Sequence, residues 1–182
     1  VLDTKRNDCT YPYKHLSGCG VGFKLMQAFA MENNIHFEEL IPLLDLLALS
    51  IASDIVPITG ENRILAFFGL KQLNSNPSTG VKAIIEVCGL KDREITISDI
   101  VFKIGPRINA SGRMKLATEA VELMVSRDYN FAYERSGTIN EYNNDRKDLD
   151  KNITDDAIAM IRLDESYAER KSIVVYKPDR HK

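Results

Sequence analysis

The chain has 182 residues, which is enough to bury a core and to form one domain or two small ones. Its composition, 44% hydrophobic and 27% charged, is that of an ordinary globular protein and excludes a disordered segment. No apolar run reaches the ~18 residues of a membrane helix, so we expect no membrane partner. The formal charge of −2 does not predict nucleic-acid binding, because the distribution of charge matters more than its sum.

The three cysteines are Cys9, Cys19 and Cys88. An odd number without CxxC spacing argues against both a disulfide framework and a zinc site. We interpret them as reduced thiols, which predicts a cytoplasmic protein. The chain begins with neither an initiator methionine nor a signal peptide, so we expect it to be a piece of a longer protein.

The first part of the chain predicts helices that pack together. Residues 1–16 are irregular, and a glycine-rich stretch at residues 17–22 leads into a helix near residues 20–31. The GxGxG spacing has no clear strand before it, so we interpret the glycines as allowing close helix packing rather than as a phosphate cradle. Residues 37–53 are apolar on nearly every side, which is typical of a buried helix, with Pro42 in its first turn.

Two more helices and a turn follow. Residues 61–73 predict a helix with five core side chains, which are Ile64, Leu65, Phe67, Phe68 and Leu70. Ser78 or Thr79 can cap a fourth helix, and Gly89 stops it. Ser98 can cap a short turn that ends at residue 104.

The last third of the chain predicts one long helix. Residues 115–126 are helical, and after a break near residues 128–130 apolar side chains recur in a narrow stripe with polar residues on every other face. About 27 helical residues would span ~40 Å and commonly bridge two lobes, and one arm of a helical hairpin is the alternative. Residues 172–176 predict a lone strand, whose partners we expect beyond residue 182.

Asp54 opens a short motif, DIVP, that directly follows the buried helix and precedes Gly60-Glu61-Asn62-Arg63. A carboxylate at the C-terminal end of a helix meets the unfavourable end of the helix dipole. A divalent cation such as Mg²⁺ or Mn²⁺ would reverse that penalty. The alternative is that Asp54 caps the next turn or pairs with Arg63, which could itself reach a phosphate.

Residues 100–118 carry basic side chains and no acidic ones; the basic residues are Lys103, Arg107, Arg113 and Lys115. Gly105, Pro106 and Gly112 would let the backbone turn tightly and approach a ligand. Arginine suits bidentate phosphate contacts, and Asn109 adds a donor for a phosphate or a base edge. The alternative is a loop whose arginines tie helices together.

These segments resemble the RecJ family of single-stranded-DNA-specific exonucleases, in the DHH phosphoesterase superfamily. The DIVP and GENR motifs within residues 54–63 resemble the family's fourth catalytic motif. Residues 104–114 resemble its GPRxNAxGRM segment, with Ser111 where alanine is usual, and this segment separates RecJ from smaller DHH phosphodiesterases. Residues 11–25 resemble the stretch that follows the family's DHH motif, so the similarity runs along most of the chain.

The departure from the family is that the sequence contains no Asp-His-His and none of the earlier aspartate motifs, which supply most of the metal ligands. The resemblance therefore implies a mainly α fold: a helical fragment of an α/β DHH-type phosphoesterase, with a long connecting helix and little of the parent sheet. Residues 1–127 would end the DHH catalytic domain, residues 128–168 would form the connecting helix, and residues 169–182 would begin the DHH-associated C-terminal domain. Apolar surface on residues 37–53, left bare by the missing sheet, would favour self-association.

For function, the resemblance implies a parent protein that degrades single-stranded DNA in the 5′ to 3′ direction, in DNA repair and recombination. Two divalent cations, Mn²⁺ or Mg²⁺, would activate water and stabilise the leaving oxygen. Asp54 matches the family's metal-binding aspartate and would be catalytic. The residues that would border the nucleic acid are Arg63, Lys103, Arg107, Asn109 and Arg113. Because one carboxylate cannot hold two metals, we expect the isolated chain to be inactive.

Two other functions stay open. A DHH-type phosphodiesterase of short oligonucleotides or cyclic dinucleotides would prefer dinucleotides and trimers to long strands. A non-catalytic helical adaptor would use Asp54 and Arg63 only as a salt bridge, so it would tolerate neutralising both residues together.

Overall fold

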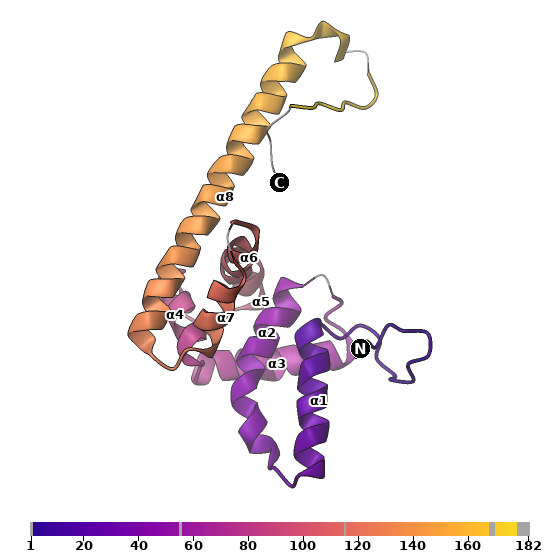
Figure 1. Cartoon of the computed structure of the whole chain (residues 1–182), viewed down its shortest axis with the longest axis vertical. Coiled ribbons are helices and arrows are strands. Elements are labelled where there is room, and N and C mark those ends of the chain that lie inside the picture. The colour runs from indigo at the N-terminus through magenta and orange to yellow at the C-terminus, as the bar shows by residue number, and fades with distance from the viewer. Residues whose placement is uncertain (1, 55, 115, 168–169, 178–182) are drawn as a thin grey trace.

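The structure is a computed structural model that describes residues 2–54, 56–114, 116–167 and 170–177. Within these ranges all regular structure is helical and no strand is formed, which confirms the mainly α fold class (Figure 1). The elements, in chain order, are α1 (Gly18–Glu32), η1 (Phe37–Leu43), α2 (Leu44–Ser53), α3 (Gly60–Ser75), α4 (Thr79–Val87), α5 (Ile97–Asp99), η2 (Ile100–Ile104), α6 (Gly105–Met114), α7 (Thr118–Val125), α8 (Tyr129–Leu163) and η3 (Glu165–Tyr167).

Helix α2 is the centre of the N-terminal half, with α1 alongside it and α3 crossing it (Figure 1). Nearly every residue of α2 is buried, as the continuous apolar pattern predicts. The expected single helix at residues 37–53 is nevertheless divided, because residues 37–43 form a 3₁₀ helix that contains Pro42. Proline has no amide hydrogen to donate to an α-helical ladder, so the α-helix begins only after it.

The core face of α3 differs from the prediction. The buried residues of this helix are Asn62, Ala66, Gly69 and Leu73, whereas Ile64, Phe67 and Phe68 are exposed by 58%, 65% and 50%. A Cβ on Gly69 would lie 2.3 Å from the Leu44 carbonyl oxygen, so α3 crosses α2 at the closest approach that two helix backbones allow. The side of α3 with small side chains therefore packs inward, and its bulky side faces outward.

A second core lies between α4, α7, η2 and the base of α8. Helix α4 has the predicted bounds, with Ser78 as its N-cap residue and Gly89 beyond its end at φ +68°. The buried carboxylate of Asp45 joins the two cores, because it accepts a hydrogen bond from the Ser78 backbone N–H at 2.7 Å.

The basic segment is helical rather than a loop. Thr96, not Ser98, caps α5, because its hydroxyl accepts from the Asp99 N–H while the Asp99 carboxylate accepts from the Thr96 N–H. The chain then continues through the π-helix η2 directly into α6, so Pro106 occupies the first turn of α6. Pro106 has no N–H to continue the ladder at this point, and the π-helical turn η2 ends directly before α6.

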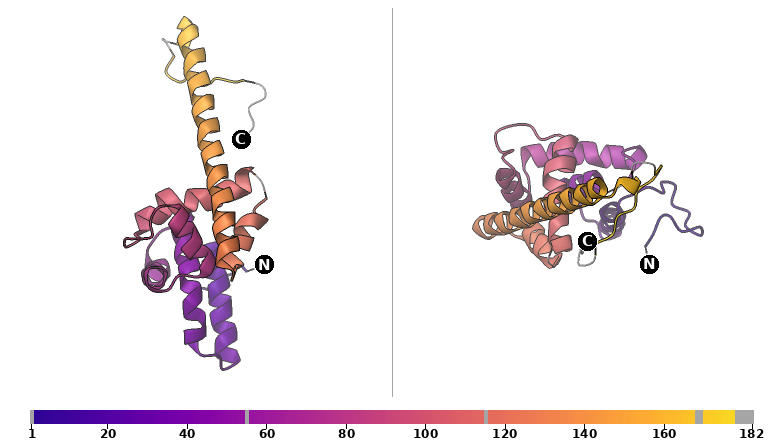
Figure 2. Two further views of the ribbon diagram at one scale, coloured as in Figure 1. Left: turned by 90° about the vertical axis from the view of Figure 1, so that its left-hand side faces the viewer. Right: turned by 90° about the horizontal axis from the view of Figure 1, so that it is seen from above.

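Helix α8 confirms the expected long helix and, at 35 residues, is longer than expected. Asp128 caps it by accepting from the Asn130 and Phe131 N–H groups. Its buried residues all lie between residues 132 and 143, and the rest of the helix extends away from the other helices (Figure 2). None of the helices within the described ranges is both long and apolar enough to cross a membrane.

The expected strand at residues 172–176 is not formed in the described part of the chain. These residues run back beside α8, where Lys177 pairs with Asp156 at 2.9 Å (Figure 1). A strand exists only by pairing with another strand, and none is present in the described ranges. The assignment of residues 169–182 to a further domain stays a prediction, and residues 168–169 and 178–182 lie outside the described residues.

Candidate functional site

Asp54 lies at the C-terminal end of α2, as the sequence predicts, and its side chain is exposed. Its backbone is extended, and its N–H donates to the Ser50 carbonyl at 3.0 Å. Asp54 borders a groove of about 490 Å³ between α1, α2 and α6. The residues that line it are Gly18, Cys19, Leu46, Leu49, Ser50, Ser53, Asp54, Ile108, Asn109 and Met124.

This groove brings the two sequence motifs together. Asn109 of α6 and Asp54 of α2 line the same space although they are far apart in the sequence. Gly105 makes this approach possible, because a Cβ at that position would lie 2.6 Å from the Ser53 hydroxyl. The glycine of the second motif therefore serves close packing between helices rather than a tight turn.

Of the glycines Gly18, Gly20 and Gly22 at the start of α1, only Gly20 is closely packed. Gly20 is buried beside Leu16 and Ser17, whereas a Cβ on Gly18 or Gly22 would have no neighbour within 4 Å. Ser17 organises this end of the groove, because its hydroxyl accepts from the Gly20 N–H at 3.1 Å and lies 3.2 Å from the Ser50 hydroxyl.

The predicted nucleic-acid-binding residues divide into two groups. Arg107 donates to the Asn140 side chain at 2.8 Å and to the Lys103 carbonyl at 2.7 Å, so it ties α6 to α8. Lys103 pairs with Asp99 at 3.3 Å. Arg63 and Arg113 are exposed, at the first turn of α3 and the last turn of α6. Lys115 lies outside the described residues.

Sequence reasoning missed the residues that hold the connection between α2 and α3. Tyr13 donates to the Thr59 carbonyl at 2.7 Å, and Asn62 donates to the carbonyls of His15 at 2.7 Å and Pro57 at 3.0 Å. Tyr11 donates to Glu61 at 2.7 Å, and burial together with this carboxylate raises the pKa of Tyr11 to about 12. No local signal could have found the contacts between residues 11–15 and residues 59–62, because they join positions more than 40 apart.

The groove fits part of a metal site. The Asp54 carboxylate and the Asn109 amide are of the oxygen-ligand type that Mg²⁺ and Mn²⁺ prefer. Within the described ranges no three His, Cys, Asp or Glu side chains lie close enough together to hold a metal ion. These residues could therefore supply part of a coordination shell but not a whole one.

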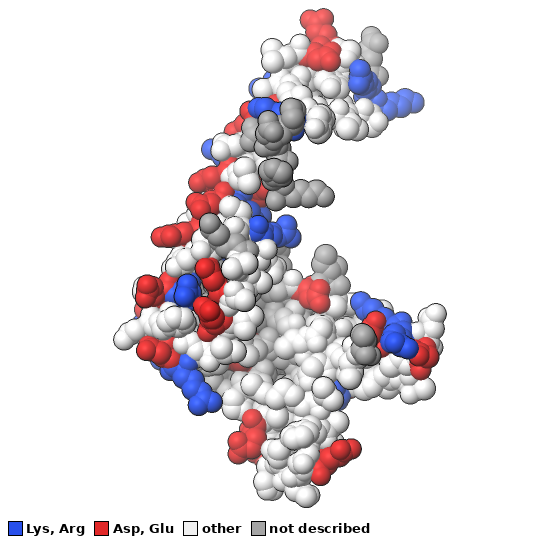
Figure 3. Space-filling model, in the orientation of Figure 1, with Lys and Arg blue, Asp and Glu red and all other residues white. Residues whose placement is uncertain are grey.

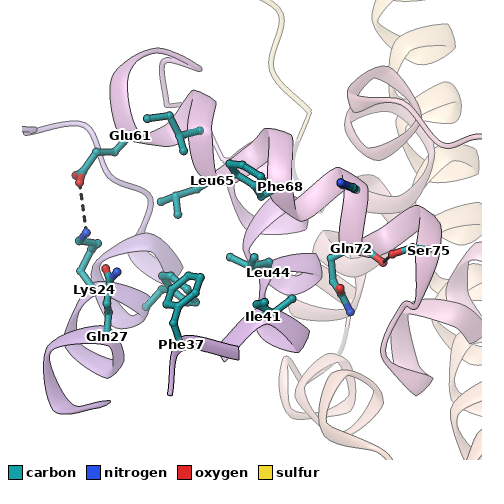
Figure 4. Close-up of a pocket in the computed structure, with 13 residues that line it drawn as sticks. Lys24, Gln27, Phe37, Ile41, Leu44, Glu61, Leu65, Phe68, Gln72 and Ser75 are labelled. Atoms are coloured by element: carbon teal, nitrogen blue, oxygen red, sulfur yellow. Dashed lines mark hydrogen bonds and ion pairs between the residues drawn. The ribbon is translucent and has the colours of Figure 1, made fainter. Parts of the chain in front are cut away.

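A second groove, of about 540 Å³, lies between α1, η1 and α3 and is mostly apolar (Figure 4). Phe23, Phe37 and Phe68 line it, and at one end Lys24 and Glu61 pair with each other at 3.4 Å.

In Figure 3 charged side chains of both signs follow α8, whereas the surface over α1 and α2 is mostly uncharged.

Comparison with known proteins shows what the chain is similar to. No family model matches it. It is 36% identical over 177 residues to the single-stranded-DNA-specific exonuclease RecJ of Bacillus subtilis (strain 168), covering 97% of this chain and 22% of that protein. It is 29% identical over 193 residues to RecJ of Escherichia coli (strain K12), covering 100% of this chain and 33% of that protein.

Solved structures agree. RecJ of Thermus thermophilus in complex with Mg²⁺ superimposes with a TM-score of 0.73 at 25% identity, over 82% of this chain and 23% of that one. An exonuclease RecJ bound to manganese superimposes with a TM-score of 0.70 at 27% identity, over 85% of this chain and 37% of that one. The chain spans about a fifth to a third of the length of these curated relatives. By sequence and by fold, the chain is similar along nearly its whole length to a helical part of RecJ proteins.

Proposed function

We propose that this chain is the part of a single-stranded-DNA exonuclease that supplies one metal-binding carboxylate, Asp54, and one border of the DNA path, α6. The observation that carries the proposal is the groove in which Asp54 and Asn109 meet. The similarity to proteins named single-stranded-DNA-specific exonucleases supports it along nearly the whole chain. Cleavage in the 5′ to 3′ direction, a role in DNA repair and recombination, and a cytoplasmic location belong to the same proposal.

The proposed cofactor is a divalent cation, because relatives have been solved with Mg²⁺ and with Mn²⁺. When bound, such cations activate water and neutralise charge on the leaving oxygen. Asp54 would hold one of them, and the remaining ligands would come from parts of the protein outside this chain. We therefore propose that the chain alone does not cleave DNA, because a single carboxylate cannot hold two metal ions.

For the DNA itself, the exposed guanidinium groups of Arg63 and Arg113 are the proposed phosphate contacts. Asn109 is proposed to reach the strand from the groove. Arg107 and Lys103 already have partners within the fold, so their proposed contribution is to the local positive potential rather than to a direct contact.

The experiment that tests the proposal uses the full-length protein. Mn²⁺-dependent digestion of a 5′-labelled single strand is compared between wild type and Asp54→Ala, with Asp150→Ala, an exposed aspartate of α8, as the control. Even residues outside the ligand shell of a metal are worth roughly 10- to 100-fold in activity, so removing a ligand should cost at least about 100-fold. Wild-type cleavage by a folded Asp54→Ala protein would make Asp54 structural and would remove the basis of the proposal.

A further inference from the structure

The chain segment that follows Asp54 is held by hydrogen bonds from the N-terminal segment and from the first turn of α3. Residues 56–59 form no helix and connect α2 to α3. Thr59, the N-cap residue of α3, makes no side-chain hydrogen bond to the helix N-terminus. The connection takes hydrogen bonds from Tyr13 of the N-terminal segment and from Asn62 of α3, while Tyr11 and His15 bind α3 beside it.

Tyr13 is the first of these partners. Its hydroxyl donates to the Thr59 carbonyl at 2.7 Å and lies 3.2 Å from the Pro57 carbonyl oxygen, so one group contacts two backbone positions of the connection. Its ring covers Gly60, where a Cβ would lie 2.7 Å from the ring. Gly60 has φ +48°, a conformation that glycine adopts without strain. The turn into α3 is thus shaped around Tyr13.

Asn62 of α3 is the second partner of the connection. Its side chain is fully buried at the start of α3. Its amide donates to the Pro57 carbonyl at 3.0 Å and to the His15 carbonyl at 2.7 Å. One side chain therefore joins the N-terminal segment, the first turn of α3 and a residue only three positions after Asp54.

We propose that Tyr13 and Asn62 are positioning residues that fix the direction of the Asp54 carboxylate. On its N-terminal side Asp54 is anchored to α2 by its N–H bond to Ser50. On its C-terminal side Val56 packs against the apolar core, and both Tyr13 and Asn62 contact the Pro57 carbonyl. Residues that orient a metal ligand are commonly worth roughly 10- to 100-fold in metal affinity. This inference rests on the proposed metal role of Asp54.

The test compares two tyrosines in the full-length protein. Tyr13→Phe keeps the ring over Gly60 and removes only the hydroxyl that contacts the connection. Tyr129→Phe is the matched control, because it removes a hydroxyl that donates at 2.6 Å to Glu86 on α4, away from Asp54. Asn62→Ala is the second variant. Mn²⁺ affinity is measured directly by calorimetry, and the Mn²⁺ concentration for half-maximal cleavage is measured alongside it.

We expect Tyr13→Phe to weaken Mn²⁺ binding on the order of 10-fold. Its cleavage rate should recover at saturating Mn²⁺, its KM for the strand should stay unchanged, and Tyr129→Phe should match wild type. Wild-type Mn²⁺ affinity in Tyr13→Phe would overturn the positioning role even if Asp54→Ala had lost the metal, which leaves the proposed function intact. Unchanged Mn²⁺ affinity in Asp54→Ala would overturn both.

Discussion

Asp99 illustrates, at the scale of single residues, how charges of the basic segment stabilise structure. Its carboxylate pairs with Arg93, accepts from the Thr96 backbone and hydroxyl at 3.1 and 2.8 Å, and pairs with Lys103. The hydrogen bond from Arg93, followed by those from Thr96, holds the pKa of Asp99 well below its usual range. The Asp99 side chain is only 8% exposed, but those of Arg93 and Lys103 are 46% and 47% exposed, so solvent still screens the two ion pairs in part.

We predict that Asp99→Asn lowers the melting temperature at pH 7 and that the difference from wild type shrinks in acid. The native pKa lies below the unfolded value of about 3.9, so the stabilisation is complete above that pH and is lost as the pH falls towards the native pKa. Thermal unfolding at pH 7, 5 and 3 measures this, with the exposed Asp148→Asn as control. An Asp99→Asn deficit that is equal at pH 7 and pH 3 would contradict the prediction.

At the scale of elements, backbone approach decides which face of a helix is buried. Helix α3 carries three large apolar side chains on its exposed face and a glycine on its buried one. Close contact between α3 and α2 at Gly69 gains dispersion energy and buries surface of both helices. This gain replaces the apolar area that Phe67 and Phe68 would bury if their side of α3 faced inward. Hydrophobicity alone selects the bulky side chains, so the predicted core was wrong for Ile64, Phe67 and Phe68, although Leu65 and Leu70 do pack against the core.

We predict that Gly69→Ala destabilises the protein by about 1–3 kcal/mol, because its Cβ would overlap the Leu44 carbonyl and the Ala48 side chain. Alanine favours the helix by up to ~1 kcal/mol over glycine. At a helical site with room for a Cβ, the same substitution should therefore stabilise the protein. Gly137→Ala on α8 is that control, since nothing lies within 4 Å of its Cβ. Urea unfolding measures both, and a stabilised Gly69→Ala protein would show that α2 and α3 can separate at little cost.

At the scale of the whole molecule, apolar surface is exposed on α1 and α3. The exposed side chains there are Leu25, Met26, Phe29, Met31, Ile64, Phe67 and Phe68. The expectation that residues 37–53 would carry the bare surface was wrong for α2, which α1 and α3 cover, although Phe37 of η1 is 45% exposed. Large exposed apolar side chains favour association when they gather into a patch.

We predict that the isolated chain self-associates through this surface, and that Phe67→Ser weakens the association. Phe102→Ser is the control, because Phe102 is 76% exposed but belongs to η2, away from α1 and α3. Sedimentation velocity across a range of concentrations measures the effect. A monomer at all concentrations, or an equal loss of association with Phe102→Ser, would contradict the prediction.

The sequence by itself determined the features that depend on neighbours along the chain. The bounds of α4, the position of Asp54 at a helix end and the long helix α8 were all predictable from caps and apolar periods, because these act within a few residues. The two motifs also sufficed for the family. Residues 172–176 show the limit of local signals, because a β-rich pattern makes no strand without a partner.

Only the tertiary structure decided how these parts combine. In the folded chain Asp54 and Asn109 line one groove. Arg107 binds Asn140 of α8, and Tyr13 and Asn62 bind the connection that follows Asp54. Each of these contacts joins helices or segments whose order in the sequence does not tell which faces meet. For the helices, the faces that meet depend on close packing at Gly69 and Gly105. Such packing involves the whole core, so it cannot be read from a short stretch of sequence.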